Sequence, residues 1–195
     1  MDDLLGPGLR LLFVGINPGL WTAAVNAHFA RPGNRFWPAL QLAGITPRRI
    51  DASAGLLAED SELLIGLGVG ISNLVPFATA RADELTDAQL RASVASLTTL
   101  VQATRPRVVA VLGLTAYRQA FADRKAGPGR QHSRLAGAEL WVLPNPSGLN
   151  AHETPVSLAA AYRAAAIAAG VIGPAKPDVA PATGVDLARP GTKGQ

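Results

Sequence analysis

Two asparagine–proline turns carry most of the polar groups that could do chemistry. Residues 15–19 (GINPG) and residues 144–149 (PNPSGL) each follow an apolar run. Proline fixes φ and glycine accepts positive φ, so either turn alone is ordinary turn chemistry. Together the turns offer the amides of Asn17 and Asn145, the hydroxyl of Ser147 and several backbone N–H groups. This set suits recognition of a flat, amide-rich ligand such as a nucleobase, and the orientation of a water molecule.

Several other chemistries fit the sequence poorly. Ser147 lies in Pro-Ser-Gly rather than in the Gly-x-Ser-x-Gly elbow of many hydrolases. The chain has no cysteine, and His28, His132 and His152 lack the spacing of a metal site. We therefore expect no metal and no cofactor, and expect each histidine to lie at the surface or against a phosphate.

Composition is that of a protein with a substantial core. The chain has 195 residues, 48% of them hydrophobic, and a net charge of +4 carried mostly by arginine. Arginine suits phosphate contacts, although genomic base composition explains such a bias equally well. The acidic start, Met1-Asp2-Asp3, does not resemble a secretory leader, so we expect a cytoplasmic protein without a membrane span. We expect one domain over residues 1–172 and a disordered tail over 173–195.

Apolar strands alternate with helices along the chain. Strands are predicted at 9–16, 69–75, 107–112 and 140–143, and helices at 35–43, 53–66, 115–121, from Thr86 onward, and from Thr154-Pro155 to about 169. Residues 123–134 are predicted as an exposed loop. The pattern predicts an α/β, three-layer fold with a central four-stranded parallel sheet flanked by helices. Ligands bind such sheets at the carboxyl ends of the strands, where both asparagine–proline turns should lie.

Five ordered motifs resemble one family, the mismatch-specific uracil/thymine-DNA glycosylases of the uracil-DNA glycosylase superfamily. The resemblance runs from about residue 5 to residue 168. The motifs are residues 7–10 (PGLR), 13–19 (FVGINPG), 32–37 (PGNRFW), 111–113 (VLG) with Ala116-Tyr117, and 141–149 (WVLPNPSGL). The resemblance implies the same four-stranded, helix-flanked sheet, and a monomeric enzyme that needs no cofactor.

The resemblance also implies roles for particular residues. Asn17 is expected to position the catalytic water. The base-binding pocket is expected to include Ile16, Phe29, Asn73 and Asn145, with Phe29 stacking on the flipped base. Ser147, Gly148 and Leu149 are expected to contact DNA, Leu149 as a wedge that fills the space left by the base. The expected partner is double-stranded DNA that contains uracil or a mismatched pyrimidine.

Two departures from the family pattern leave questions open. Ala151-His152 stands where relatives often place an arginine that holds the partner strand, so a preference for a base opposite guanine is open. Asp83 and Glu84 could bring a carboxylate over the pocket, or could be solvated charges at a helix start. Two alternatives also remain: a relative that prefers single-stranded DNA or deaminated purines, and a DNA-binding module that has lost catalysis.

Overall fold

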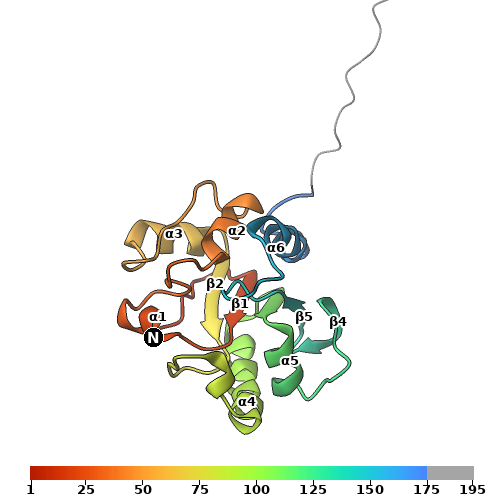
Figure 1. Ribbon diagram of the computed structural model, residues 1–195. Helices are drawn as coiled ribbons and strands as arrows, with labels where there is room; N and C mark the ends of the chain where they lie inside the picture. The colour runs from red at the N-terminus through yellow and green to blue at the C-terminus, as the bar shows by residue number, and fades with distance from the viewer. Residues whose placement is uncertain (175–195) are drawn as a thin grey trace, which may run out of the picture.

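The structure of the protein is a computed structural model that describes residues 1–174. Five strands form one sheet in the order β2-β1-β3-β5-β4 (Figure 1). The strands are β1 (Leu11–Gly15), β2 (Val69–Asn73), β3 (Val108–Leu112), β4 (Gly129–Leu135) and β5 (Ala138–Leu143). Strands β1, β2, β3 and β5 are mutually parallel, and β4 is antiparallel to β5.

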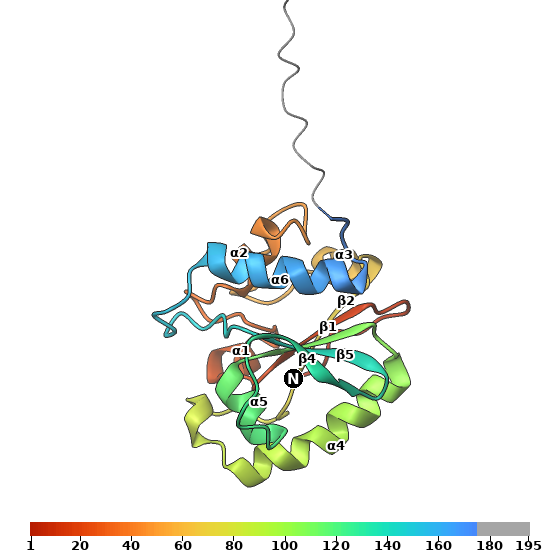
Figure 2. The same ribbon diagram turned by 90° about the vertical axis from the view of Figure 1, so that its right-hand side faces the viewer.

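Helices cover both faces of this sheet, so the molecule has three layers (Figure 2). One face carries α2, α3 and α6, and the opposite face carries α4 and α5. The helices are α1 (Leu20–Ala24), α2 (Phe36–Leu42), α3 (Ala58–Gly66), α4 (Asp87–Thr104), α5 (Leu114–Ala120) and α6 (Pro155–Ala169). A short 3₁₀ helix spans Ala82–Glu84. The predicted α/β three-layer fold is confirmed.

The central strand β1 shows why its sequence is apolar throughout. Leu11 and Phe13 pack into the core beneath α2, α3 and α6, whereas Leu12 and Val14 pack into the core beneath α4 and α5. Successive side chains of a strand point to opposite faces, so a strand covered on both sides needs apolar residues at every position. Each of these four side chains is fully buried.

Local sequence determines where the two longest helices begin. Thr86 accepts a hydrogen bond from the backbone N–H of Gln89, whose side chain accepts one from the N–H of Thr86. Thr154 and Ser157 form the same reciprocal pair before α6, and Pro155 occupies the first turn. Such capping boxes satisfy backbone donors that a helix start leaves free. The predicted starts of both helices are confirmed.

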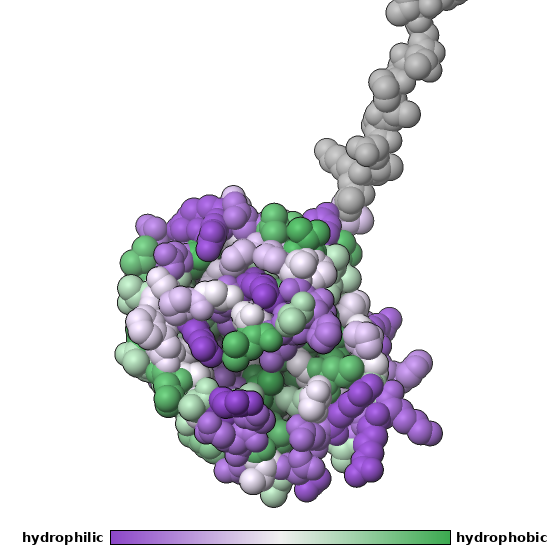
Figure 3. Space-filling view, viewed as in Figure 1, coloured by the Kyte–Doolittle hydropathy of each residue, from purple (hydrophilic) through white to green (hydrophobic). Residues whose placement is uncertain are grey.

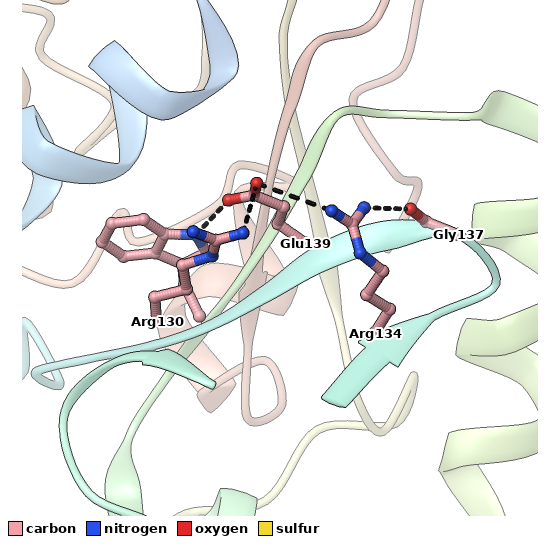
Figure 4. A network of polar contacts seen from close by, with 5 residues as sticks. Arg130, Arg134, Gly137 and Glu139 are labelled. Atoms are coloured by element: carbon pink, nitrogen blue, oxygen red, sulfur yellow. Dashed lines mark hydrogen bonds and ion pairs between the residues drawn. The ribbon is translucent and has the colours of Figure 1, made fainter. Parts of the chain in front are cut away.

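The sheet differs from the prediction at one edge. The four parallel strands are where the sequence placed them, but part of the predicted 123–134 loop is the edge strand β4. Glu139 of β5 accepts a hydrogen bond from Arg130 at 2.9 Å and lies 3.8 Å from Arg134, which also donates to the Gly137 carbonyl (Figure 4). Edge strands are often charged, which prevents pairing with other chains. A strand of this kind has no apolar alternation, and pairing with β5 is what makes it a strand.

The helix predicted over 53–66 begins only at Ala58. Before it, Asp51 accepts a hydrogen bond from the N–H of Ser53 at 3.0 Å, and Gly55 has a φ of +123°. An aspartate that bonds the backbone two residues ahead stabilises a turn in competition with a helix. The five-residue helix α1 was not predicted.

The amino-terminal residues complete the other edge of the sheet. Leu4 and Ile71 exchange two backbone hydrogen bonds of 2.9 Å, so Leu4 pairs with the outer side of β2. Within residues 1–174, no helix is long and apolar enough to cross a bilayer. The tail predicted over 173–195 lies, from residue 175 onward, outside the described residues.

Candidate functional site

The two asparagine–proline turns meet at one edge of the sheet. They follow β1 and β5, which are parallel, and Asn73 ends the neighbouring strand β2. A cavity of ≈ 610 Å³ opens at these strand ends. Pockets for small ligands have volumes of roughly 300–1,000 Å³. Seven of the eight site residues expected from the sequence line this cavity: Ile16, Asn17, Phe29, Asn73, Asn145, Ser147 and Leu149.

Asn17 is half-buried in this cavity, and its amide is oriented by Thr79. The Thr79 hydroxyl donates to the carbonyl of Arg81 at 2.7 Å, so its oxygen is free to accept. It accepts from Asn17 Nδ2 at 2.7 Å, and weaker contacts join Nδ2 to the Pro18 and Phe77 carbonyls. All these partners are acceptors, which leaves Asn17 Oδ1 as the available acceptor of the amide. The arrangement can hold a water molecule by one of its hydrogens.

Asn73 is oriented by a buried histidine. His28 is 4% exposed, and its Nε2 lies 3.1 Å from the backbone carbonyl of Asp2, which can only accept. Nε2 therefore carries the ring hydrogen, and Nδ1 faces Asn73 Nδ2 at 3.4 Å as an acceptor. Burial lowers the pKa of His28 from 6.5 to about 4, against a smaller rise from its bond to Asp2. The ring is neutral at neutral pH, and Asn73 keeps Oδ1 and its second N–H for a ligand.

The expectation that His28 lies at the surface or on a phosphate is wrong. Asn26, Ala27 and Arg31 around it suggest an exposed turn, whereas in the structure its ring is buried with Nε2 against the carbonyl of Asp2 in the amino-terminal segment. Thr79 was not singled out either. Its partner Asn17 is 62 positions away, and no pattern in the sequence links the two.

Phe29 forms an aromatic wall of the cavity. Its ring stacks on Phe36 with centroids 4.1 Å apart, and its backbone has a positive φ of 54°. Gly15 allows this approach, because a Cβ there would lie 2.5 Å from Asn73 Oδ1 and 3.2 Å from Phe29 Cζ. A side chain at residue 15 would thus displace Phe29 or Asn73, and glycine at the end of β1 keeps both close to the cavity.

The second turn forms a ridge between two hollows. A second cavity of ≈ 550 Å³ shares Ile16, Asn145, Ser147 and Leu149 with the first. Asn145 Oδ1 accepts from the N–H of Ser147 at 2.9 Å, and the Ser147 hydroxyl accepts from the N–H of Leu149 at 3.3 Å. Leu149 is 75% exposed, the largest value among the exposed large apolar side chains of residues 1–174. Gly148 faces the backbone of Gly33 rather than the cavity.

Asp83 reaches the cavity rim, and Glu84 does not line it. Arg81 binds both carboxylate oxygens of Asp83, at 3.0 Å and 2.6 Å, and this hydrogen bonding lowers the pKa of Asp83. Both side chains are exposed. A carboxylate with a lowered pKa is a weaker base, so Asp83 is poorly suited to take a proton from water.

Charge and polarity on this side of the molecule are mixed. In the view of Figure 3, hydrophobic residues near the centre of the face are surrounded by hydrophilic ones. Arg31 and Arg81 line the cavity and are exposed. Over residues 1–174, no three His, Asp or Glu side chains come together as metal ligands could.

The fold and the cavity define an α/β protein with a cavity at the carboxyl ends of its parallel strands. A model of the uracil DNA glycosylase superfamily matches residues 3–168, so the chain belongs to this superfamily. Its members are DNA glycosylases, hydrolases that cut the bond between a base and its sugar.

A solved structure shares the fold. A protein from Methanosarcina acetivorans, described as a candidate uracil DNA glycosylase and solved by solution NMR, superposes with a TM-score of 0.55 at 17% sequence identity. The match covers 84% of this chain and 94% of the other. At this identity the similarity supports the α/β architecture, and the function of the individual residues must be argued from the site itself.

Proposed function

We propose that this protein excises uracil from double-stranded DNA after turning the nucleotide out of the helix, and that it belongs to the mismatch-specific branch of its superfamily. One observation carries the proposal: a single cavity brings Asn17, Asn73 and Phe29 together beside the exposed Leu149. A stacked base hides its sugar bond, so an enzyme that cuts this bond must extrude the nucleotide.

The cavity suits an imide base. Phe29 offers a ring on which the base can stack, and Asn73 offers an acceptor and a donor to the base edge. Uracil presents a donor N3–H flanked by carbonyl acceptors, which is complementary to an amide. Ile16 and Asn145 would complete the walls of the pocket.

Catalysis would rest on water orientation and charge stabilisation. Water held by Asn17 adds its oxygen to C1′, the N-glycosidic bond breaks, and the bonding electrons leave with the base. The water proton ends on the departed base, leaving an abasic site. Backbone N–H groups around a dry pocket can stabilise the charge that develops on the base. Thymine should be a poorer substrate than uracil, because its methyl group is bulky and donates electrons.

The test is a substrate panel in excess chelator, with duplexes containing G·U, A·U or G·T, single-stranded uracil DNA, and duplexes with deaminated purines. Abasic sites are revealed by alkaline cleavage. We expect fastest excision of uracil from duplex DNA. Excision of deaminated purines alone, or only from single strands, would favour the corresponding superfamily alternative. DNA binding without excision of any base would favour a binding module.

Asn17→Ala supplies the matched variant for this panel. We expect the single-turnover rate to fall by roughly 100-fold or more, the scale of a lost positioned hydrogen-bonding group. Melting temperature and DNA affinity should change little, because the side chain lies at a cavity rather than in a core. Excision at the wild-type rate would show that another group orients the water.

A further inference from the structure

Arg35 is attached to the loop that carries Leu149. The residue precedes α2 and is half-buried, more than 110 positions from its partners. Its Nη1 donates to the carbonyls of Asn150 at 2.7 Å and Glu153 at 2.8 Å, and its Nη2 donates to the carbonyl of Gly148 at 3.2 Å. Its backbone N–H donates to the carbonyl of Pro146 at 2.9 Å. One residue thus binds four carbonyls of a single loop.

We propose that Arg35 is a positioning residue that holds residues 146–153, and with them Leu149, in the geometry needed to enter a duplex. The inference rests on the proposed function and deepens it. It assigns to Arg35 no contact with the base, the sugar or a phosphate.

The chemistry of the side chain suits this task. Residues 146–153 contain no strand or α-helix, so their carbonyls lack the partners that regular structure supplies. A guanidinium presents several donors in a fixed plane, and charged donors make stronger hydrogen bonds than neutral ones. An ammonium group has no such fork, and cannot reproduce the geometry of the three side-chain bonds.

Other contacts restrict the same loop. A Cβ at Gly148 would lie 2.7 Å from the carbonyl oxygen of Gly33, so the two backbones pack directly together. The hydroxyl of the fully buried Tyr162 donates to the carbonyl of Pro144 at 3.3 Å. Tyr162 anchors the start of the loop, and Arg35 with Gly33 anchors its middle and end. Leu149, which is 75% exposed, projects from a backbone that is held on both sides.

A held loop changes what binding costs. If Leu149 had to be ordered while the nucleotide is extruded, the loss of loop entropy would add to the cost of unstacking. A loop already in place avoids this addition. Single-stranded DNA has no stack to replace, so the advantage should be specific to duplexes.

The experiment compares Arg35→Gln and Arg35→Lys with Arg49→Ala, which removes one exposed positive charge outside the cavity. Single-turnover excision is measured on duplex and single-stranded uracil DNA. Hydrogen–deuterium exchange of residues 147–153 is measured without DNA. For Arg35→Gln we expect a roughly 10- to 100-fold lower rate on the duplex, the scale of a group displaced by about 1 Å. The rate on single-stranded DNA should stay within about threefold of wild type, because a single strand has no stack for Leu149 to replace.

Exchange in the loop should accelerate in both Arg35 variants and stay unchanged in Arg49→Ala. Arg35→Lys, which retains the charge and one donor site, should lie between wild type and Arg35→Gln. Its intermediate rate provides the test if the glutamine variant folds poorly. Combining Arg35→Gln with Gly148→Ala should lower the duplex rate by less than the product of the two single effects, because both changes release one loop.

Three outcomes would overturn the proposal. One is unchanged loop exchange in Arg35→Lys, and another is an equal loss of rate on duplex and single strand. The third concerns the salt dependence of DNA binding by Arg35→Gln. If the slope of the logarithm of the DNA-binding constant against the logarithm of salt concentration became less steep by about one, Arg35 would be identified as a phosphate contact. If the wild-type protein excised no base at all, the proposed function would fail, whereas the exchange measurement would still decide whether Arg35 holds the loop.

Discussion

Two side-chain amides in the cavity, those of Asn17 and Asn73, are each oriented by a neighbour whose own hydrogen is already committed. Thr79 gives its hydrogen to Arg81, and His28 gives its ring hydrogen to Asp2. Each neighbour can then only accept, so each amide must direct Nδ2 toward it. At the scale of single residues, the acceptors that face a ligand are therefore selected by groups outside the cavity or at its rim.

Replacing Thr79 tests this selection. Thr79→Val keeps the shape of the side chain but removes the acceptor for Asn17. We expect the single-turnover rate to fall by about fivefold, the equivalent of one hydrogen bond of roughly 1 kcal/mol. Thr79→Ser should restore most of the rate, because serine keeps the hydroxyl. A valine variant as fast as wild type would mean that Asn17 is oriented without Thr79.

His28 predicts how stability depends on pH. The unfolded histidine binds a proton below pH 6.5, whereas the buried ring does so only near pH 4. Between these values the unfolded state binds more protons, so the free energy of unfolding rises with pH and is fully regained above pH 6.5. The loss on acidification is at most about 3.5 kcal/mol. Asp3, whose pKa is raised chiefly by partial burial, acts in the opposite direction, because the folded state holds its proton more readily than the unfolded state does.

Urea denaturation of the wild type and His28→Gln between pH 5 and 7 measures this effect. The glutamine variant cannot titrate and should lose less stability than the wild type as the pH falls from 7 to 5. Identical pH dependence in both proteins would show that His28 is protonated as easily in the folded state as in the unfolded one.

At the scale of elements, the loop over 144–149 should distinguish duplex from single-stranded DNA. Leu149→Ala removes the exposed apolar side chain but leaves the other residues that line the cavity unchanged. We expect the free energy of extrusion to rise by roughly 1–3 kcal/mol on a duplex, the scale of lost stacking. Single-turnover rates on both substrates measure this. An equal loss on single-stranded uracil DNA would assign Leu149 to the pocket instead.

Elements that depend on local chemistry could be predicted from the sequence, and elements that depend on distant partners could not. Neighbouring residues determine the capping pairs at Thr86 and Thr154 and the apolar runs of the four parallel strands. Strand β4 is charged and exists because β5 lies beside it, with Glu139 between two arginines. Its register with β5 shifts between Arg130 and Arg134, an irregularity that no alternation pattern could reveal.

The same distinction holds for the candidate site. The asparagine–proline turns identified Asn17 and Asn145 because turn residues are recognisable one at a time. Arg35 lies in the PGNRFW motif, but its role could not be predicted, because its partners are backbone carbonyls that no residue type identifies. His28 depends on the Asp2 carbonyl, a backbone atom that every residue has. The sequence thus predicted which groups face the cavity better than which groups hold them.

At the scale of the whole molecule, the sheet brings together residues that are far apart in the chain. The cavity combines the ends of β1, β2 and β5 with the segment near Thr79. These ends lie on one side because β1, β2 and β5 run in the same direction, and the chain must cross back along the sheet between any two parallel strands. The conformation of the cavity therefore depends on the packing of both helical layers.

The pairing of Leu4 with Ile71 has a consequence for how the protein behaves in concentrated solution. An uncovered edge strand can recruit a strand from another molecule and start aggregation. At one edge of this sheet, the charged side chains of β4 disfavour pairing with another chain. At the other edge, the residues around Leu4 cover β2. Leu4→Pro would remove the N–H that donates to the Ile71 carbonyl, one of the two backbone hydrogen bonds between Leu4 and Ile71, whereas Leu4→Ala would keep both. Light scattering should therefore detect self-association in the proline variant first, and amino-terminal trimming by a protease should turn a stable preparation into one that precipitates.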